Sequence, residues 1–423
     1  MFIVYDLIFL ILTIFNLPLY LLRGKFHNGF SRRLGFLPDN LNLERPIWVH
    51  AVSVGEAVAI KGLVAGLRET YPQKKIVIST VTSTGNKIAN TLAKEGDFLT
   101  YLPLDFSFIV GGVLKRIKPC MFIIAETEIW PNLISCLYRQ NIPIITVNGR
   151  ISDGSYKGYR AIKFFIRPIL RKVTQFCVQT DTDFMRLRDL GVDKDRVLVT
   201  GNVKFDINPE NVLPEFALSY RQKLWLTAED KLLVCGSTHP KEEEIIFEAY
   251  KKLLVVLPKL KLLIAPRHPE RSRDIGNLAS RCGFMPIFIS SVPKACPTCV
   301  NRPVFILDVI GELFNYYSAA DIVFIGGSLV KKGGHNILEP ASIKKPVIFG
   351  PHMFNFRQIS KLFLRNNAAI MVYNSKGLTG KIKEILKSDA MAKELVDRAY
   401  DLIKKNRGAT QKNIQAISKT NLN

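Results

Sequence analysis

The sequence predicts two α/β domains, each with a parallel sheet that helices cover on both faces. Short apolar runs rich in β-branched residues alternate with amphipathic segments in the first half of the chain, and the same alternation is repeated in the second half. Such alternation is typical of parallel sheets, whose strands are buried on both faces. The chain has 423 residues. A typical domain has about 150 residues, so the chain is too long to fold around a single hydrophobic core.

The apolar runs define the strand candidates and the domain boundaries. In the first half the candidates are residues 47–52, 75–81, 98–103, 120–125, 142–147 and 175–179. In the second half they are residues 232–235, 261–265, 286–289, 304–307, 322–325, 347–349 and 369–372. Residues 206–226 contain two Pro-Glu turns and no strand pattern, so they are the predicted linker. We expect one domain over 23–205 and another over 227–423, facing one another across a cleft, with the last helices able to pack back on the first domain.

Residues 1–22 precede the first domain and are almost wholly apolar. Their number is close to the roughly 20 residues that a membrane helix requires, and nothing marks them as a cleaved signal peptide. We therefore predict a membrane anchor, because the alternative, a core helix of a soluble domain, usually has a polar face. Arg23, Lys25, Arg32 and Arg33 follow, which predicts that the main part of the chain is cytoplasmic. The pattern leaves open whether the anchor spans the bilayer or lies in one leaflet.

The charge and the cysteines narrow the classes of function. The formal net charge is +23. Hydrophobic residues make up 48% of the chain and charged residues 22%, which is typical of a globular protein. No dense basic run with interleaved aromatic residues occurs, so a nucleic-acid partner is disfavoured, and an anionic membrane surface or substrate accounts better for the charge. Cys296 and Cys299 form a CxxC pair, but without a second ligand pair we interpret them as ordinary thiols on a loop.

Charged residues follow several of the predicted strands in the first half. Glu56 lies at the turn from the first strand to a predicted helix over 57–70, where a carboxylate also serves as an ordinary helix cap. Glu126 and Glu128 follow the strand at 120–125, and charged residues are rarely placed at the end of a buried strand for packing alone. Lys204 closes the first domain, where a lysine is suited to meet an anionic group but is equally typical of a solvated turn.

Glycines, hydroxyls and basic residues follow the strands of the second half. Pro266 and Arg267 come directly after one strand, and the run Gly-Ser-Thr-His at 236–239 follows another. A glycine-rich stretch at 326–334 leads into a helix that contains Glu339. Such turns bring backbone N–H groups and cations to an anion, while Glu339 is placed either to bind ribose hydroxyls or to stabilise the helix dipole. The pattern is neither a P-loop nor GxGxxG, which argues against an ATPase or an ordinary dinucleotide enzyme.

Taken in chain order, these segments resemble the Kdo transferases of lipopolysaccharide synthesis, which transfer 3-deoxy-manno-octulosonic acid (Kdo) and have the GT-B fold of two Rossmann-like domains. The likeness extends over nearly the whole chain, although residues 282–308 match nothing expected of the family. An ordered set of motifs is far more specific than any one of them. The motifs are SVGE, ETEIWPN, NGRIS, GNVKFD, GSTH, APRHPER, GGS, GGHNILEP and FGPHMFNF.

The resemblance implies an inverting transfer of Kdo from CMP-Kdo to a hydroxyl of the lipid A precursor lipid IVA, with no metal ion and no other cofactor. It implies that Glu56 is the proton acceptor and that Glu126 and Lys204 stabilise the transition state. The first domain then binds the acceptor and the second the donor. The donor nucleotide site maps onto Pro266, Arg267, Ile310, Gly311, Glu312, Asn336, Ile337, Leu338 and Glu339.

An anionic lipid acceptor gives the predicted anchor and the net charge one explanation, and makes anionic lipids of the inner membrane an expected partner. Two other interpretations stay open. A GT-B transferase that uses a UDP-sugar for another envelope precursor shares the late glycine-rich region but not the ordered motifs. A noncatalytic membrane-surface adaptor on the same scaffold is disfavoured, because Glu56, Glu126, Lys204 and Glu339 are all present.

Overall fold

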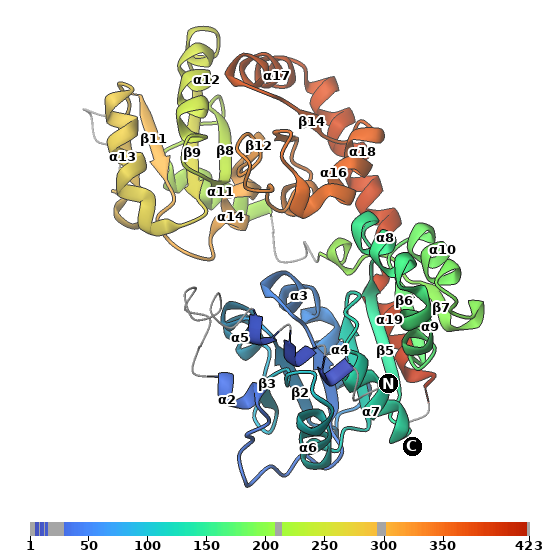
Figure 1. Cartoon of the computed structure of the whole chain (residues 1–423). Helices are drawn as coiled ribbons and strands as arrows, with labels where there is room; N and C mark the ends of the chain where they lie inside the picture. The colour runs from blue at the N-terminus through green and yellow to red at the C-terminus, as the bar shows by residue number, and fades with distance from the viewer. Residues whose placement is uncertain are drawn as a thin grey trace. The chain divides into compact units, whose positions relative to one another are not determined.

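The structure, a computed structural model, describes residues 5–7, 9–11, 13–15, 29–207, 214–293 and 302–420. Contacts divide the chain into two compact units: unit 1 comprises Met1–Asp206 and Asn406–Asn423, and unit 2 comprises Ile207–Lys405. Each unit contains a seven-stranded parallel sheet with helices packed around it (Figure 1). The prediction of two α/β domains with parallel sheets is therefore confirmed.

The sheet of unit 1 has the strand order β3-β2-β1-β4-β5-β6-β7. Its strands are β1 (Ile47–His50), β2 (Ile76–Thr80), β3 (Phe98–Tyr101), β4 (Met121–Ala125), β5 (Ile144–Gly149), β6 (Gln175–Val178) and β7 (Val197–Val199). Its helices are α2 (Phe30–Arg33), α3 (Val54–Ala59), α4 (Lys61–Thr70), α5 (Ser83–Asn90), α6 (Ser107–Ile117), α7 (Pro131–Arg139), α8 (Asp153–Ala161), α9 (Lys163–Leu170), α10 (Asp181–Asp189) and α19 (Ala409–Ser418), with 3₁₀ helices η1 (Lys194–Arg196) and η2 (Val203–Phe205). The chain runs outward from β1 to β3 and then returns to the other side of β1, so the strand order reverses between β1 and β4.

The core of unit 1 occupies both faces of this sheet. Trp48 of β1 lies opposite Phe122 of β4 and packs into one apolar cluster, while the next pair, Val49 and Ile123, packs into a second cluster on the other face. Successive side chains of a strand point to opposite faces, so strands covered on both sides read as continuous apolar runs. Each fully buried apolar side chain of this size contributes roughly 1.5–3 kcal/mol. The runs therefore located these strands from sequence.

The end of the chain completes unit 1. Helix α19 packs against α4, with Ile414 seated over Gly66, where any larger side chain would collide with it. The carboxylate of Asp206 accepts hydrogen bonds from the backbone N–H groups of Gly408 (2.7 Å) and Thr410 (2.5 Å), which fixes the start of the helix. Figure 1 shows α19, in red, among the blue and green elements of unit 1.

The sheet of unit 2 has the order β10-β11-β9-β8-β12-β13-β14, which reverses between β8 and β12. Its strands are β8 (Lys231–Thr238), β9 (Leu260–Pro266), β10 (Met285–Phe288), β11 (Pro303–Ile306), β12 (Ile322–Ile325), β13 (Val347–Phe349) and β14 (Ile370–Met371). Its helices are α11 (Pro214–Lys223), α12 (Glu243–Val256), α13 (Ser272–Arg281), α14 (Leu313–Ala319), α15 (Leu338–Ser342), α16 (Arg357–Arg365), α17 (Ser375–Lys387) and α18 (Asp389–Asn406), with 3₁₀ helices η4 (Pro269–Arg271), η5 (Ile289–Ser291) and η6 (Phe354–Phe356). Cys296 and Cys299 lie outside the described residues.

The segment predicted as a linker contains helix α11, which the sequence analysis did not anticipate. Tyr220 of this helix meets Tyr316 edge to face, with ring centroids 4.8 Å apart. Arg221 forms an ion pair with Asp321 at 3.0 Å and donates to the carbonyl of Ala319. These contacts make the second part of the segment an integral element of unit 2 rather than a structureless connection.

The described residues near the N-terminus are helical and dock on unit 1. The carboxylate of Asp6 accepts hydrogen bonds from the Ser107 backbone N–H (3.1 Å) and the Asn132 side chain (2.6 Å), at the beginnings of α6 and α7. Tyr5 stacks on Phe165. Among the residues the structure describes, no helix has both the length and the apolar character to cross a bilayer. The remaining residues of the predicted anchor, with Arg23 and Lys25, lie outside the described residues.

Candidate active site

Glu56 is held at the first turn of α3, which begins at Val54 rather than at the predicted residue 57. Its carboxylate accepts hydrogen bonds from the Val52 backbone N–H (2.7 Å) and the Ser53 hydroxyl (3.2 Å). The predicted single helix is divided in two, because α3 ends at Ala59 and α4 begins at Lys61. Glu56 therefore stabilises the helix start, as the capping interpretation expected, and follows β1 at the point where the strand order reverses.

Glu126 follows β4, the strand beside β1, and has a left-handed backbone with φ of 58°. Asn148 at the end of the next strand, β5, is also left-handed, with φ of 52°. A residue with a side chain takes this conformation at a cost of about 1–2 kcal/mol, which asparagine tolerates best. Strained residues of this kind cluster at functional sites. Two neighbouring strands thus turn sharply at their carboxyl ends, on the edge where open α/β sheets bind ligands.

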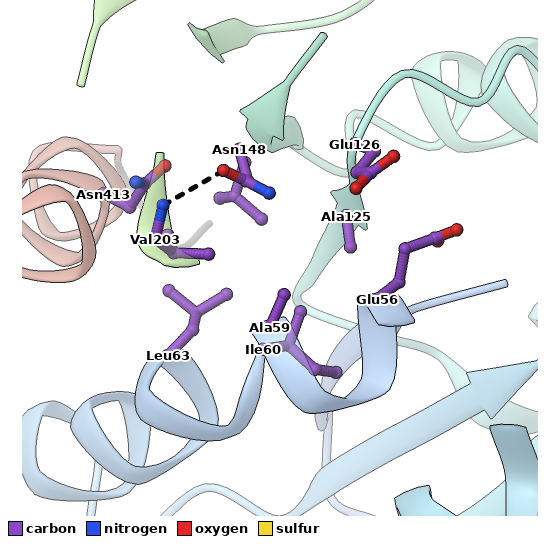
Figure 2. Close-up of a pocket in the computed structure, with 10 residues that line it drawn as sticks. Glu56, Ala59, Ile60, Leu63, Ala125, Glu126, Asn148, Val203 and Asn413 are labelled. Carbon is purple, nitrogen blue, oxygen red and sulfur yellow. Dashed lines mark hydrogen bonds between the residues drawn. The ribbon is translucent and has the colours of Figure 1, made fainter. Parts of the chain in front are cut away.

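Glu56 and Glu126 are among the residues that line one small cavity of unit 1 (Figure 2). Its volume is about 10 Å³, which is room for roughly one oxygen-sized group. The structure brings together these two sequence-predicted residues, which lie seventy positions apart. The remaining lining residues are Ala59, Ile60, Leu63, Ala125, Val147, Asn148, Val203 and Asn413.

The environment of Glu56 raises its pKa to about 7. Burial is the main cause, and the negative charges of Glu126 and Glu128 act in the same direction, while the hydrogen bond from Val52 lowers the pKa. Because the pKa is raised, the carboxylate gains its charge as the pH rises through neutrality and loses it below. A base with a pKa near the working pH is suited to proton transfer.

Lys204 lies in η2, and a chain of amide hydrogen bonds fastens this turn to the sheet edge. Asn202 accepts from the Lys204 backbone N–H (3.0 Å) and donates to Gln179 (3.0 Å). Gln179 donates in turn to the Asn148 carbonyl (3.0 Å), and the Asn148 side chain accepts from the Val203 N–H (3.2 Å). Lys204 is thereby placed next to Val203, which lines the cavity. The sequence pattern indicates no role for Asn148 or Gln179.

In unit 2, Pro266 ends β9 and Arg267 follows with its side chain exposed. The Arg267 backbone N–H donates to the Thr238 carbonyl at the end of β8 (3.0 Å). Ile310, Gly311 and Glu312 follow β11, the neighbour of β9, and Ile310 is 87% exposed. Within the described residues no side-chain hydrogen bond joins these three to Arg267. They share the carboxyl edge of the sheet with it.

Two histidines meet where the strand order of unit 2 reverses. The Nε2 atoms of His239, after β8, and His335, after β12, lie 3.0 Å apart in stacked rings. Burial lowers the pKa of both imidazoles to about 4, and the positive charges of Lys332 and Arg267 add to this effect. Both rings are therefore neutral at pH 7. The motifs GSTH and GGHN had drawn attention to these segments, but not to the contact between their histidines.

Asn336 and Glu339 interact at the start of α15. Asn336 donates to the Glu339 carboxylate (3.1 Å) and accepts from the Leu338 N–H (3.1 Å). Burial raises the pKa of Glu339. Ile337 and Leu338 are fully buried, so their side chains serve the core. Of the predicted donor residues, the structure thus links Asn336 directly to Glu339.

The glycine-rich loop after β12 differs from the expectation that its backbone N–H groups receive a phosphate. The N–H groups of Gly327, Ser328 and Leu329 donate to the carboxylate of Glu242, at 2.6, 3.0 and 2.9 Å. Glu242 is fully buried, and this burial raises its pKa to about 7. The expectation was wrong at these three positions, because an internal carboxylate from the turn before α12 already occupies the anion site.

Comparisons with known proteins agree with the motifs. A family model described as 3-deoxy-D-manno-octulosonic-acid transferase (Kdo transferase) matches residues 28–207. A 3-deoxy-D-manno-octulosonic acid transferase from Haemophilus influenzae is 34% identical over 391 residues, which cover 92% of this chain and 90% of that protein. A protein of the same name from Chlamydophila psittaci is 33% identical over 82% of this chain and 78% of its own length.

Two solved structures show how widely the fold is shared. A glycosyltransferase from Rickettsia africae has a TM-score of 0.56 at 17% identity, over 89% of this chain and 100% of that one. A UDP-GlcNAc 2-epimerase from Neisseria meningitidis has a TM-score of 0.59 at 13% identity, with the same coverage of 89% and 100%.

The two Rossmann-like domains, each with a parallel sheet, resemble those of GT-B glycosyltransferases. Within that class, the chain belongs to the 3-deoxy-D-manno-octulosonic acid transferase family, because it matches the Haemophilus influenzae transferase over nearly the full length of both. The family resemblance drawn from the ordered motifs is confirmed.

Proposed function

We propose that the protein transfers Kdo from CMP-Kdo to a hydroxyl of lipid IVA, with inversion at the anomeric carbon. The observation that carries this proposal is the cavity shared by Glu56, with its pKa near 7, and Glu126. Unit 1 binds the lipid acceptor, and unit 2 binds the CMP moiety of the donor through Pro266, Arg267, residues 310–312 and residues 336–339.

The reaction is a single displacement. The acceptor oxygen forms a bond to the anomeric carbon as the bond from that carbon to the phosphate oxygen breaks, and CMP departs with the bonding electrons. Glu56 takes the proton from the acceptor hydroxyl. Glu126 stabilises positive charge that develops on the sugar, and Lys204 stabilises negative charge on the departing phosphate. All atoms and charges are accounted for without a further reactant.

Purified protein incubated with CMP-Kdo and lipid IVA is expected to yield a product heavier than lipid IVA by one or more Kdo residues, as measured by mass spectrometry. Free CMP is expected in equal amount to the Kdo transferred. UDP-sugars supplied in place of CMP-Kdo are expected to give no product. Transfer from a UDP-sugar but not from CMP-Kdo would contradict the proposal and favour the alternative envelope transferase.

The N-terminal segment supports a membrane site for this reaction. Leu7, Leu10, Ile11, Ile14 and Phe15 are 57%, 44%, 46%, 59% and 77% exposed. Their spacing of three and four residues places them on one face of a helix. An exposed apolar stripe of this kind is typical of helices that lie in a membrane interface. We therefore propose that this segment inserts shallowly into the inner membrane from the cytoplasmic side, with the net charge of +23 favouring anionic lipids.

The double variant Ile11→Asp/Phe15→Asp is expected to lose roughly 100-fold in affinity for vesicles that contain anionic phospholipid, because each apolar side chain contributes about 1.5–3 kcal/mol when buried. Flotation with vesicles measures this change. Val255→Asp, at an 83% exposed position of unit 2, serves as the control. Unchanged flotation of the double variant would show that another surface holds the protein on the membrane.

A further inference from the structure

The side chain of Asn148 has a defined orientation. It is only 2% exposed, and its Oδ1 atom accepts a hydrogen bond from the Val203 backbone N–H at 3.2 Å. A backbone N–H can only donate, so the atom facing Val203 must be the amide oxygen. The other atom, Nδ2, consequently carries its two hydrogens away from Val203.

Nδ2 of Asn148 is buried and has no hydrogen-bond partner in the described part of the chain. Figure 2 shows it directed across the cavity, toward the side on which Glu126 and Glu56 lie. Buried donors are nearly always satisfied in folded proteins, so one that is not indicates a bound group. The backbone conformation agrees, since the left-handed φ of 52° and the bond from Gln179 to the Asn148 carbonyl hold the side chain in this position.

The polar groups around the cavity complement one another. Asn148 Nδ2 is a neutral donor, and Oδ1 of Asn413 is a buried acceptor that also lacks a partner among the described residues. Glu56 and Glu126 are the acidic residues of the lining, and Ala59 and Leu63 supply apolar walls. The volume of about 10 Å³ suits one oxygen atom. A hydroxyl group is the chemical group that needs one donor and one acceptor at the same oxygen.

We propose that the Asn148 amide donates a hydrogen bond to the attacking hydroxyl of the acceptor and so orients its O–H toward the Glu56 carboxylate. This inference rests on the proposed function, since it assigns the hydroxyl of that reaction to this cavity. Asn148 would then be a second catalytic residue beside Glu56, and its role would be to select an alcohol as the nucleophile. The hydroxyl oxygen has two lone pairs. One accepts the hydrogen bond from Asn148, and the other stays free to attack the anomeric carbon.

Asn148→Asp is the sharpest test, because the aspartate keeps the acceptor for Val203 and tolerates the left-handed backbone, but loses the donor. Its kcat/KM for lipid IVA at saturating CMP-Kdo is expected to fall by about 10- to 100-fold. Its affinity for CMP-Kdo is expected to stay near that of the wild type, whereas its thermal midpoint is expected to fall, because the added carboxylate is buried in the cavity that Glu56 and Glu126 also line. The added negative charge is expected to raise the pKa of Glu56 and move the acidic limb of the pH profile upward.

Asn148→Gly separates the lost donor from the added charge, because glycine also accepts a left-handed backbone. It is expected to lose kcat/KM for the acceptor without the upward shift of the acidic limb. Asn141→Asp, the same substitution at an exposed position of unit 1 that is also left-handed (φ of 54°) and precedes β5, serves as the control. Its kinetics are expected to match those of the wild type.

Two results would overturn the proposed role of Asn148. If both Asn148 variants keep kcat/KM within threefold of the wild type, the cavity holds only a water molecule and the inference is wrong. An equal loss of acceptor turnover and of CMP-Kdo affinity in both Asn148 variants would show a purely structural role and would also overturn the inference. If the wild-type protein itself transfers no Kdo, the proposed function fails instead.

Discussion

Glu56→Gln is expected to lower kcat for Kdo transfer by about 10³-fold, within the range that loss of a general base produces. Glutamine keeps the size of the side chain and can still accept the hydrogen bond from Val52, but it cannot take a proton. The helix start therefore stays intact while the chemistry is lost. Single-turnover measurement of Kdo transfer to lipid IVA gives the rate directly.

The control for this variant is Glu69→Gln, which makes the same change on the exposed face of α4 in the same unit. Its turnover is expected to equal that of the wild type. Binding of CMP-Kdo to the Glu56→Gln protein is expected to be retained, because the residues that we propose to bind the donor all belong to unit 2. Turnover of the Glu56→Gln protein at the wild-type rate would remove this carboxylate from the mechanism.

Arg267→Ala is expected to weaken the binding of CMP-Kdo by about 100-fold, which corresponds to the loss of a charge-assisted bond to phosphate. Arg267 follows β9 at the carboxyl edge of the sheet, and its positive charge helps to lower the pKa of the half-buried His335. The pKa of His335 is therefore expected to rise in the Arg267→Ala protein. Titration calorimetry with CMP measures the affinity, and NMR of the imidazole measures the pKa.

Arg273→Ala on the exposed side of α13 provides the comparison for Arg267, since it removes an equal charge from the same unit. A similar loss of CMP affinity in both variants would point to the general positive field of unit 2. Unchanged CMP affinity in the Arg267→Ala protein would place the phosphate elsewhere on this sheet edge.

The strands were predictable because burial on both faces leaves a continuous apolar run, as at Ile47–His50. The exception is β7, which was not predicted. Strand β7 has only three residues, and Leu198 and Val199 are 44% and 41% exposed at the edge of the sheet. Helix α11 was missed because its contacts come from Tyr316 and Asp321, which lie about a hundred positions further along the chain.

The candidate site was predictable where it follows from the position of a residue after a strand. Glu56 and Glu126 lie at the ends of adjacent parallel strands, so their meeting at one edge follows from the order of the sheet. The roles of Glu242 and Asn148 could not be predicted in this way. They depend on which donors find acceptors in three dimensions, and a glutamate before a helix or an asparagine in a turn looks ordinary in sequence.

The return of the chain to unit 1 bears on how the protein is synthesised. Because residues 406–423 belong to unit 1, this unit is interrupted in the sequence by the whole of unit 2. The ribosome therefore completes unit 2 before it releases the last helix that unit 1 needs. Asn413 of that helix lines the cavity beside Glu56. Loss of α19 would thus damage the unit whose strands are translated first.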